Sequence, residues 1–255
     1  MSMNIEVATT IESTTKDKGD LLEHLSAEFL KTQGYEIDKE VRVTASELDL
    51  LCKHKVNKRT VYVECKAHRD ALSSNILTQL LGTINLNNYE EGWLITTGAL
   101  GKDAKGFKVT WENKPVKESQ KLSIYTPELI ISSLIDAKVI KAQPDELAVD
   151  ILENEDILGT WTLLITSFGK FWALTCLSGG IPEGVLIFSA LTSHLVDDPK
   201  TLENIAKTDT SIRNLDFNFI KKIQQKTHEP AAVIEVQHGN SWVDYRPARP
   251  QDFVG

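Results

Sequence analysis

Leu48-Asp49-Leu50-Leu51 and Thr60-Val61-Tyr62-Val63-Glu64-Cys65-Lys66 are the stretches that decide the fold of this chain. The runs that contain them, Val41–Leu51 and Thr60–Lys66, each predict a strand. The link between them, Lys53–Arg59, is polar and basic, as the tip of a hairpin should be. Side chains two apart in a strand point to the same face, so Glu64 and Lys66 should project together. The hairpin should then bring Asp49 beside Glu64.

Two carboxylates and an ammonium on one sheet face are costly to bury without a purpose. The carboxylates repel each other, and a hard divalent cation such as Mg²⁺ relieves that repulsion. A neighbouring lysine can orient a metal-bound water or stabilise charge that develops on a phosphate. The grouping therefore favours metal-assisted phosphodiester hydrolysis. The alternative is an ordinary cross-strand ion pair on a solvated face.

The flanking sequence predicts helices and short strands in alternation. An apolar pattern with helical spacing runs from Gly19 to Gly34, and Gly34 suits the position just after a helix. Further elements are expected as a helix at Ser73–Leu86, a strand at Gly92–Gly98, a helix at Lys102–Trp111, a strand at Leu122–Tyr125 and a helix at Pro127–Ala137. This order predicts an α/β fold with a mixed sheet flanked by helices.

A second, smaller α+β domain is expected after a break near Lys141–Glu146. Its predicted strands are Trp161–Phe168, Lys170–Leu177, Val185–Ala190 and Ala232–Val236, and its predicted helices lie near Lys200–Lys207, capped by Asp198, and at Phe217–Lys226. The predicted organisation is a flexible N-terminus over residues 1–17, a first domain over 18–140, a connecting domain over 150–245 and a linker over 246–255.

Charge is distributed unevenly along the chain. The 255 residues carry a net charge of −8, which argues against a protein that coats nucleic acid by bulk charge. Residues 51–121, however, hold 12 Lys and Arg against 7 Asp and Glu, a net of +5.

The N-terminus lacks the apolar core of a signal peptide, and the apolar stretch Ile157–Leu177 is better explained by buried strands than by a membrane span. Three cysteines without metal-finger spacing suit a reduced cytoplasm.

Four short motifs in order and spacing resemble a known family. They are Gly19-Asp20-Leu21-Leu22-Glu23, Glu47-Leu48-Asp49-Leu50-Leu51, Val63-Glu64-Cys65-Lys66 and Ile95-Thr96-Thr97-Gly98. Together they resemble the catalytic domain of Mrr-type restriction endonucleases, a branch of the PD-(D/E)xK nuclease superfamily, over about Lys18–Phe107. Glu47 and Leu100-Gly101 depart from the family's pattern, which loosens the fit of loops and leaves the catalytic groups in place.

The resemblance implies roles for individual residues. Asp49 and Glu64 would be metal ligands for Mg²⁺, with Mn²⁺ as a substitute, and Lys66 would be the catalytic lysine. Glu23 would complete or support the metal site, and its alternative is an exposed helix carboxylate. Gln79 would be a polar active-site residue. The implied substrate is double-stranded DNA.

Two basic groups lie in the same part of the chain. Lys53, Lys55, Lys58 and Arg59 belong to the expected hairpin tip, and Lys102, Lys105 and Lys108 recur every three residues on an expected helix. Both groups are expected to contact the DNA backbone on the two sides of a cleft. The alternative is a polar turn and a solvated helix face.

The last six residues, Pro250–Gly255, resemble the segment that introduces the ATPase module of STAND (NACHT-like) proteins. This resemblance implies that the chain is the N-terminal effector of an antiviral STAND ATPase, activated by homo-oligomerisation. Two other functions stay open: a catalytically silent DNA-binding or oligomerisation module, and cleavage of RNA or single strands by the same site.

Overall fold

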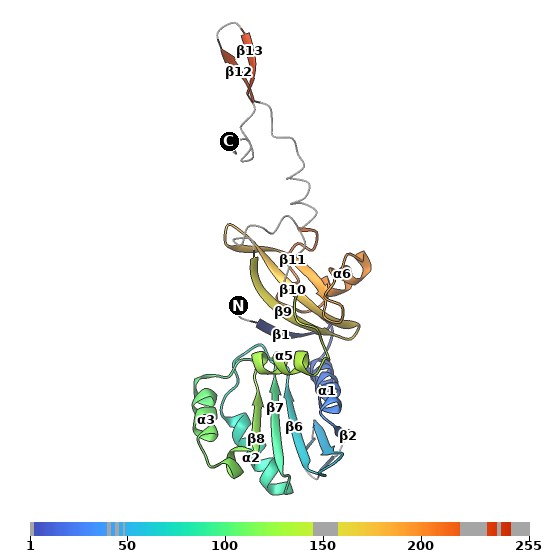
Figure 1. Cartoon of the computed structure of the whole chain (residues 1–255), viewed down its shortest axis with the longest axis vertical. Coiled ribbons are helices and arrows are strands. Elements are labelled where there is room, and N and C mark those ends of the chain that lie inside the picture. Colours follow the sequence, from blue (N-terminus) through green and yellow to red (C-terminus); the bar gives the residue numbers. More distant parts are fainter. Residues whose placement is uncertain are drawn as a thin grey trace.

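The computed structural model describes residues 3–39, 42–43, 46–47, 49–144, 158–219, 234–238 and 241–245. The described residues form a five-stranded and a four-stranded sheet, with helices packed between and around them, and two further sheets of two strands each (Figure 1). The prediction of a mixed α/β fold is confirmed. Within the described part of the chain, no helix combines the length and the apolar character needed to cross a membrane.

The first sheet has five strands and contains both stretches that decide the fold. Its strands, in spatial order, are β2 (Tyr35–Lys39), β5 (Leu50–His54), β6 (Thr60–Lys66), β7 (Glu91–Thr96) and β8 (Leu122–Tyr125). Neighbours from β2 to β6 are antiparallel, and those from β6 to β8 are parallel. The tight hairpin between β5 and β6 explains the antiparallel part, and helical crossovers explain the parallel part.

Helices cover both faces of this sheet. They are α1 (Thr15–Thr32), α2 (Asn75–Asn87), α3 (Lys102–Glu112) and α5 (Pro127–Asp136), and a short helix without buried residues, α4 (Val116–Ser119), follows α3. Val61, Val63 and Cys65 of β6 pack in the core that contains α1 and α5, whereas Tyr62 packs in the core that contains α2 and α3. The period-2 alternation read from the sequence is therefore confirmed. Gly34, with a φ of +84°, follows α1 as expected.

The second sheet contains three of the four strands expected in the C-terminal half, plus one that was not expected. Its strands, in spatial order, are β1 (Met3–Ala8), β9 (Leu158–Thr166), β10 (Gly169–Ser178) and β11 (Ile181–Ser189). The helix α6 (Pro199–Ala206) starts at the predicted cap, where Asp198 Oδ2 accepts a hydrogen bond of 2.8 Å from the Thr201 amide.

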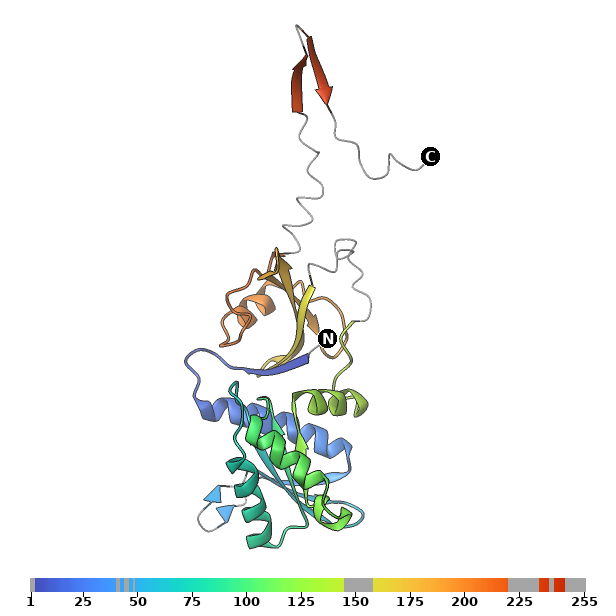
Figure 2. The same cartoon turned by 90° about the vertical axis from the view of Figure 1, so that its left-hand side faces the viewer.

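The prediction of a flexible N-terminus over residues 1–17 is wrong for residues 3–8, which form a strand. β1 pairs in parallel with β9, with Ile5 opposite Leu163, and it lies on the side of the second sheet that faces α1 and α5 (Figures 1 and 2). Ile5 and Val7 are buried there. Local composition did not predict this strand, because its partner lies more than 150 residues away in the sequence. The burial that stabilises β1 depends on the second sheet.

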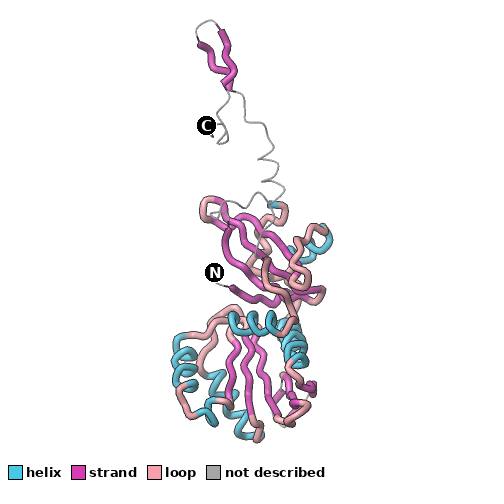
Figure 3. Tube along the Cα trace, in the orientation of Figure 1, coloured by secondary structure: helices cyan, strands magenta, loops and turns pink. Residues whose placement is uncertain are grey.

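The two sheets share one hydrophobic core. One cluster of buried residues joins Phe29, Val63 and Trp93 of the first sheet and its helix to Trp161 and Trp172 of the second. Figure 3 shows the strands of the two sheets separated by the helices α1 and α5. This continuity predicts that both sheets unfold together.

Several expected boundaries differ from the structure. The expected strand Val41–Leu51 is divided: β3 (Arg42–Val43) pairs with β4 (Ser46–Glu47), and β5 starts at Leu50. The sequence reading also missed β2, α4 and the hairpin partner of β12 (Ile234–His238), which is β13 (Ser241–Tyr245). Most of the expected helix at Phe217–Lys226 and the whole expected linker 246–255 lie outside the described residues.

Candidate active site

The carboxyl end of β6 brings three polar side chains together on one face. Lys66 Nζ forms an ion pair with Glu64 Oε1, and the Tyr62 hydroxyl donates a hydrogen bond to Glu64 Oε2. The side chains of Glu64 and Lys66 are 20% and 26% exposed, so the pair is shielded yet reachable from solvent. Both carboxylate oxygens of Glu64 are therefore engaged by donors from its own strand.

Asp49 lies next to this pair. It directly precedes β5, one step beyond the register pair Leu50–Val63, which places it opposite Glu64 in the antiparallel hairpin. The Cys65 amide donates a hydrogen bond of 2.7 Å to Asp49 Oδ2. The hairpin thus gathers Asp49, Glu64 and Lys66 at one end of two neighbouring strands.

The electrostatics of the group favour a charged lysine. Partial burial acts to lower the pKa of Lys66, but the hydrogen bond and charge of Glu64, together with the charge of Asp49, outweigh it, so the pKa rises above its ordinary value. Burial and the neighbouring Glu64 raise the pKa of Tyr62, so its phenol keeps its proton. The site therefore offers two carboxylates, one ammonium and one neutral hydroxyl.

Glu23 approaches this region from the other face of the sheet. Glu23 lies on α1 and is half-buried. Burial raises the pKa of the Cys65 thiol most, and the negative charges of Asp49 and Glu23 raise it further. Cys65 Sγ also lies 3.4 Å from Ser26 Oγ of α1. Cys65 is thus part of the packing under the site, as its buried position on the α1 side indicates.

Gln79 is exposed on α2, which covers the face of the sheet that carries Tyr62. Across the described residues, no group of three or more His, Cys, Asp or Glu side chains is placed to hold a metal ion. Asp49 and Glu64 nonetheless form a fitting donor set for Mg²⁺, because this ion uses one or two carboxylates and keeps several waters.

The two basic groups occupy different ends of the sheet. The hairpin tip with Lys53, Lys55, Lys58 and Arg59 precedes Thr60, and Lys66 lies at the opposite end of β6, about 20 Å away at ~3.3 Å per residue. The structure therefore does not place this tip beside the carboxylates. Arg59 also forms an ion pair of 2.8 Å with Glu91.

The helix α3 starts near the carboxylates. The Thr97 amide, which follows β7, donates a hydrogen bond of 3.1 Å to the Lys66 carbonyl, and the chain then enters α3 at Lys102. Lys102 and Lys105 are exposed, whereas Lys108 forms an ion pair of 2.5 Å with Glu112. DNA contact by either group stays a prediction, and the position of the α3 lysines suits it better.

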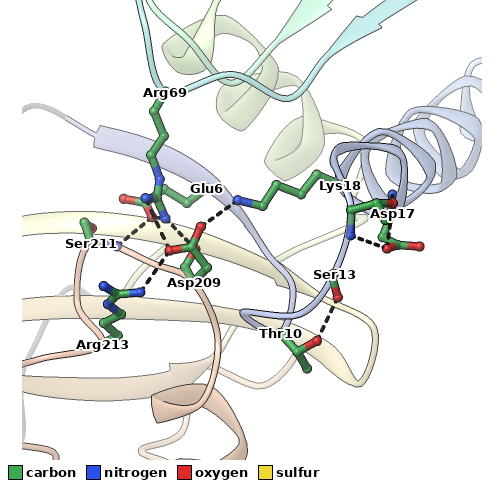
Figure 4. Close-up of polar contacts among 10 residues, drawn as sticks. Glu6, Thr10, Ser13, Asp17, Lys18, Arg69, Asp209, Ser211 and Arg213 are labelled. Carbon is green, nitrogen blue, oxygen red and sulfur yellow. Dashed lines mark hydrogen bonds and ion pairs between the residues drawn. The ribbon is translucent and has the colours of Figure 1, made fainter.

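Sequence reasoning missed the polar contacts that connect α1 and the loop after β6 to β1 and to the residues after α6. Arg69, three residues beyond Lys66, lies 3.7 Å from both Glu6 of β1 and the Asp209 carboxylate (Figure 4). Lys18 of α1 donates a hydrogen bond of 2.9 Å to Asp209. No local motif announces these contacts, because their partners are separated by up to 191 residues. Tyr62 was also missed, although its two-residue spacing from Glu64 placed it on the same strand face.

Part of the chain matches a known protein family. Residues 16–117 match the Mrr_cat restriction endonuclease family. This stretch, 102 of the 255 residues, is similar to restriction endonuclease domains. The matched stretch holds Glu23, Asp49, Glu64 and Lys66. No curated protein matches the chain.

Two solved structures match about half of this chain at low identity. The protein of unknown function AF1548 is 14% identical, with a TM-score of 0.38, over 52% of this chain and 76% of its own. The DNA modification-dependent restriction endonuclease AspBHI is 12% identical, with a TM-score of 0.34, over 49% of this chain and 36% of its own.

Proposed function

We propose that the chain is a metal-dependent endonuclease that hydrolyses phosphodiester bonds of double-stranded DNA, with Mg²⁺ as the ion and Mn²⁺ as a substitute. The observation that carries this proposal is the joint placement of Asp49, Glu64 and Lys66 at one end of β5 and β6. The match of the same stretch to a restriction endonuclease family supports DNA as the substrate.

Each residue has a role in the proposed reaction. Asp49 and Glu64 would hold the cation through their carboxylate oxygens, and Glu23 would assist from α1. When bound, a divalent cation lowers the pKa of a water ligand and stabilises charge on the phosphate. Lys66, kept charged by the two carboxylates, orients the attacking water and stabilises negative charge as it develops.

Plasmid cleavage tests the proposal. We expect Lys66→Ala to reduce the cleavage rate by about 10²–10³-fold, the usual cost of removing one charge-stabilising donor. Asp49→Asn should abolish cleavage while the circular dichroism spectrum stays native. Lys117→Ala is the matched control, because Lys117 is exposed on α4 and contacts none of the three residues. Full cleavage by the Lys66→Ala protein would remove Lys66 from the mechanism.

The same assay separates the alternative functions. DNA binding without any cleavage in Mg²⁺ or Mn²⁺ would favour a silent DNA-binding or oligomerisation module. Faster cleavage of RNA or of single-stranded DNA than of the plasmid would assign the same site another substrate. The net charge of +5 over residues 51–121 supports a nucleic-acid substrate in each case.

We further propose that this endonuclease is the effector of a cytoplasmic anti-phage STAND ATPase and acts as a homo-oligomer. The support is the resemblance carried by Pro250–Gly255, together with the acidic balance outside residues 51–121, which keeps the affinity of a single copy for DNA low. The test is phage challenge of bacteria that express the protein or its Lys66→Ala form, with light scattering of the activated protein. Equal protection by both forms would refute an effector role for the nuclease site.

A further inference from the structure

Tyr62 is a buried side chain whose hydroxyl reaches the candidate active site. The residue is 3% exposed, and it packs in the cluster that includes Leu77, Leu80 and Leu94. The ring also lies 6.1 Å from the ring of Tyr89, centroid to centroid. Packing thus fixes the ring, and the hydroxyl is held where it donates to Glu64 Oε2.

We infer that Tyr62 is a positioning residue that orients the Glu64 carboxylate for a divalent cation. This inference rests on the proposed function, because it concerns the same site. A glutamate side chain has three rotatable bonds, and fixing them on metal binding costs conformational entropy. A carboxylate that is already held by a rigid donor has paid much of this cost during folding, so it binds the cation more tightly.

The second donor to Glu64 cannot perform this task alone. Lys66 has a flexible four-carbon stem, and in the proposed reaction its ammonium acts on the attacking water and the phosphate. When Lys66 turns to these groups, its ion pair with Glu64 Oε1 weakens. The hydrogen bond from Tyr62 to Oε2 then remains as the contact that fixes the carboxylate, and Oε1 is left open to a cation.

A buried phenol needs a hydrogen-bond partner in any protein, so the contact with Glu64 could serve stability alone. The two roles predict different consequences. A purely structural hydroxyl changes the melting temperature when it is removed and leaves metal affinity unchanged. A positioning hydroxyl changes metal affinity, because groups that orient metal ligands typically contribute 10–100-fold to binding.

The test is Tyr62→Phe, which keeps the packed ring and removes only the hydroxyl. Binding of Mn²⁺ alone is measured by isothermal titration calorimetry, and the Mn²⁺ concentration for half-maximal plasmid cleavage is measured beside it. We expect the dissociation constant for Mn²⁺ and the Mn²⁺ concentration for half-maximal cleavage to rise about tenfold in Tyr62→Phe. Tyr89→Phe is the matched control: it makes the same chemical change on the ring packed against Tyr62, and it should leave both values unchanged. Thermal unfolding verifies that both variants are folded.

The outcomes separate this inference from the proposed function. If the wild-type chain binds Mn²⁺ and cleaves DNA while Tyr62→Phe has the same Mn²⁺ affinity, the positioning role is wrong and the endonuclease stands. An equal loss in Tyr89→Phe overturns it too, since the effect would then come from packing. If the wild-type chain neither binds Mn²⁺ nor cleaves DNA, both the function and the inference fall.

Discussion

Asp209→Asn should weaken the polar contacts that connect α1 and the loop after β6 to the residues after α6. The Asp209 carboxylate accepts a hydrogen bond of 2.9 Å from Lys18 and lies 3.3 Å from Arg213 and 3.7 Å from Arg69. Asparagine has nearly the same shape but no charge. The substitution therefore removes the carboxylate shared by Lys18, Arg213 and Arg69, and of these three Arg69 keeps its contact with Glu6 (Figure 4).

The magnitude follows from distance and exposure. A hydrogen bond between charged groups contributes about 1.5–3 kcal/mol when well shielded, and exposed ion pairs contribute about 0.2–1 kcal/mol. The side chains of Lys18 and Asp209 are 22% and 32% exposed, so solvent screens part of the interaction. We expect a loss of about 1–2 kcal/mol, which lowers Tm by about 3–6 °C in a chain of this size.

Thermal unfolding followed by circular dichroism measures this loss at low salt and in 1 M NaCl. The difference should shrink in 1 M NaCl, where the Debye length is about 3 Å. Glu203→Gln is the control: it breaks an exposed ion pair of 2.6 Å with Lys207 inside one helix and should leave Tm unchanged. A Tm of Asp209→Asn within about 1 °C of wild type, or a loss that salt does not alter, would refute the reasoning.

The pH dependence has a defined sign. The hydrogen bond from Lys18 holds the pKa of Asp209 below its ordinary value of 3.8; partial burial acts the other way, and the charges of Arg69 and Arg213 add to the lowering. The stability it contributes is therefore fully present above pH 3.8 and is lost as the pH falls through the lowered pKa of the folded state. The gap between wild type and Asp209→Asn should close over that range.

The native thiols should not react with Ellman's reagent at pH 8, because burial raises the pKa of Cys52 and Cys176 to about 12 and that of Cys65 well above its ordinary value. All three should react in denaturant, and rapid labelling of the native chain would contradict the burial. Gly92→Ala should destabilise the fold by about 1–3 kcal/mol in urea unfolding, because the new methyl group would overlap the Ile84 side chain of α2. An unchanged urea midpoint would show that Ile84 moves aside freely.

The local elements were readable from the sequence because their signals are local. Alternation along Thr60–Lys66 predicted both faces of β6, and the Asp198-Pro199 pair predicted the start of α6. The same alternation, with the basic hairpin link, placed Asp49 beside Glu64 and Lys66. These patterns survive in the structure because strand periodicity, turn chemistry and caps act over a few residues.

Other features were decided by tertiary structure alone. The strand β1 is defined by its pairing with β9. Arg69 lies near Glu6 and Asp209 because the two sheets pack together. Composition predicted neither, because it does not state which distant segments will meet.

The candidate site shows both kinds of information. The sequence by itself determined which carboxylates and which lysine share one strand end, since that depends on a hairpin and on period-2 alternation. The tertiary structure decided what surrounds them: α1 brings Glu23 to the opposite face, and packing of α2 and α3 holds the Tyr62 ring so that its hydroxyl meets Glu64. Burial by distant elements fixes those neighbours, and burial is a property of the packed chain.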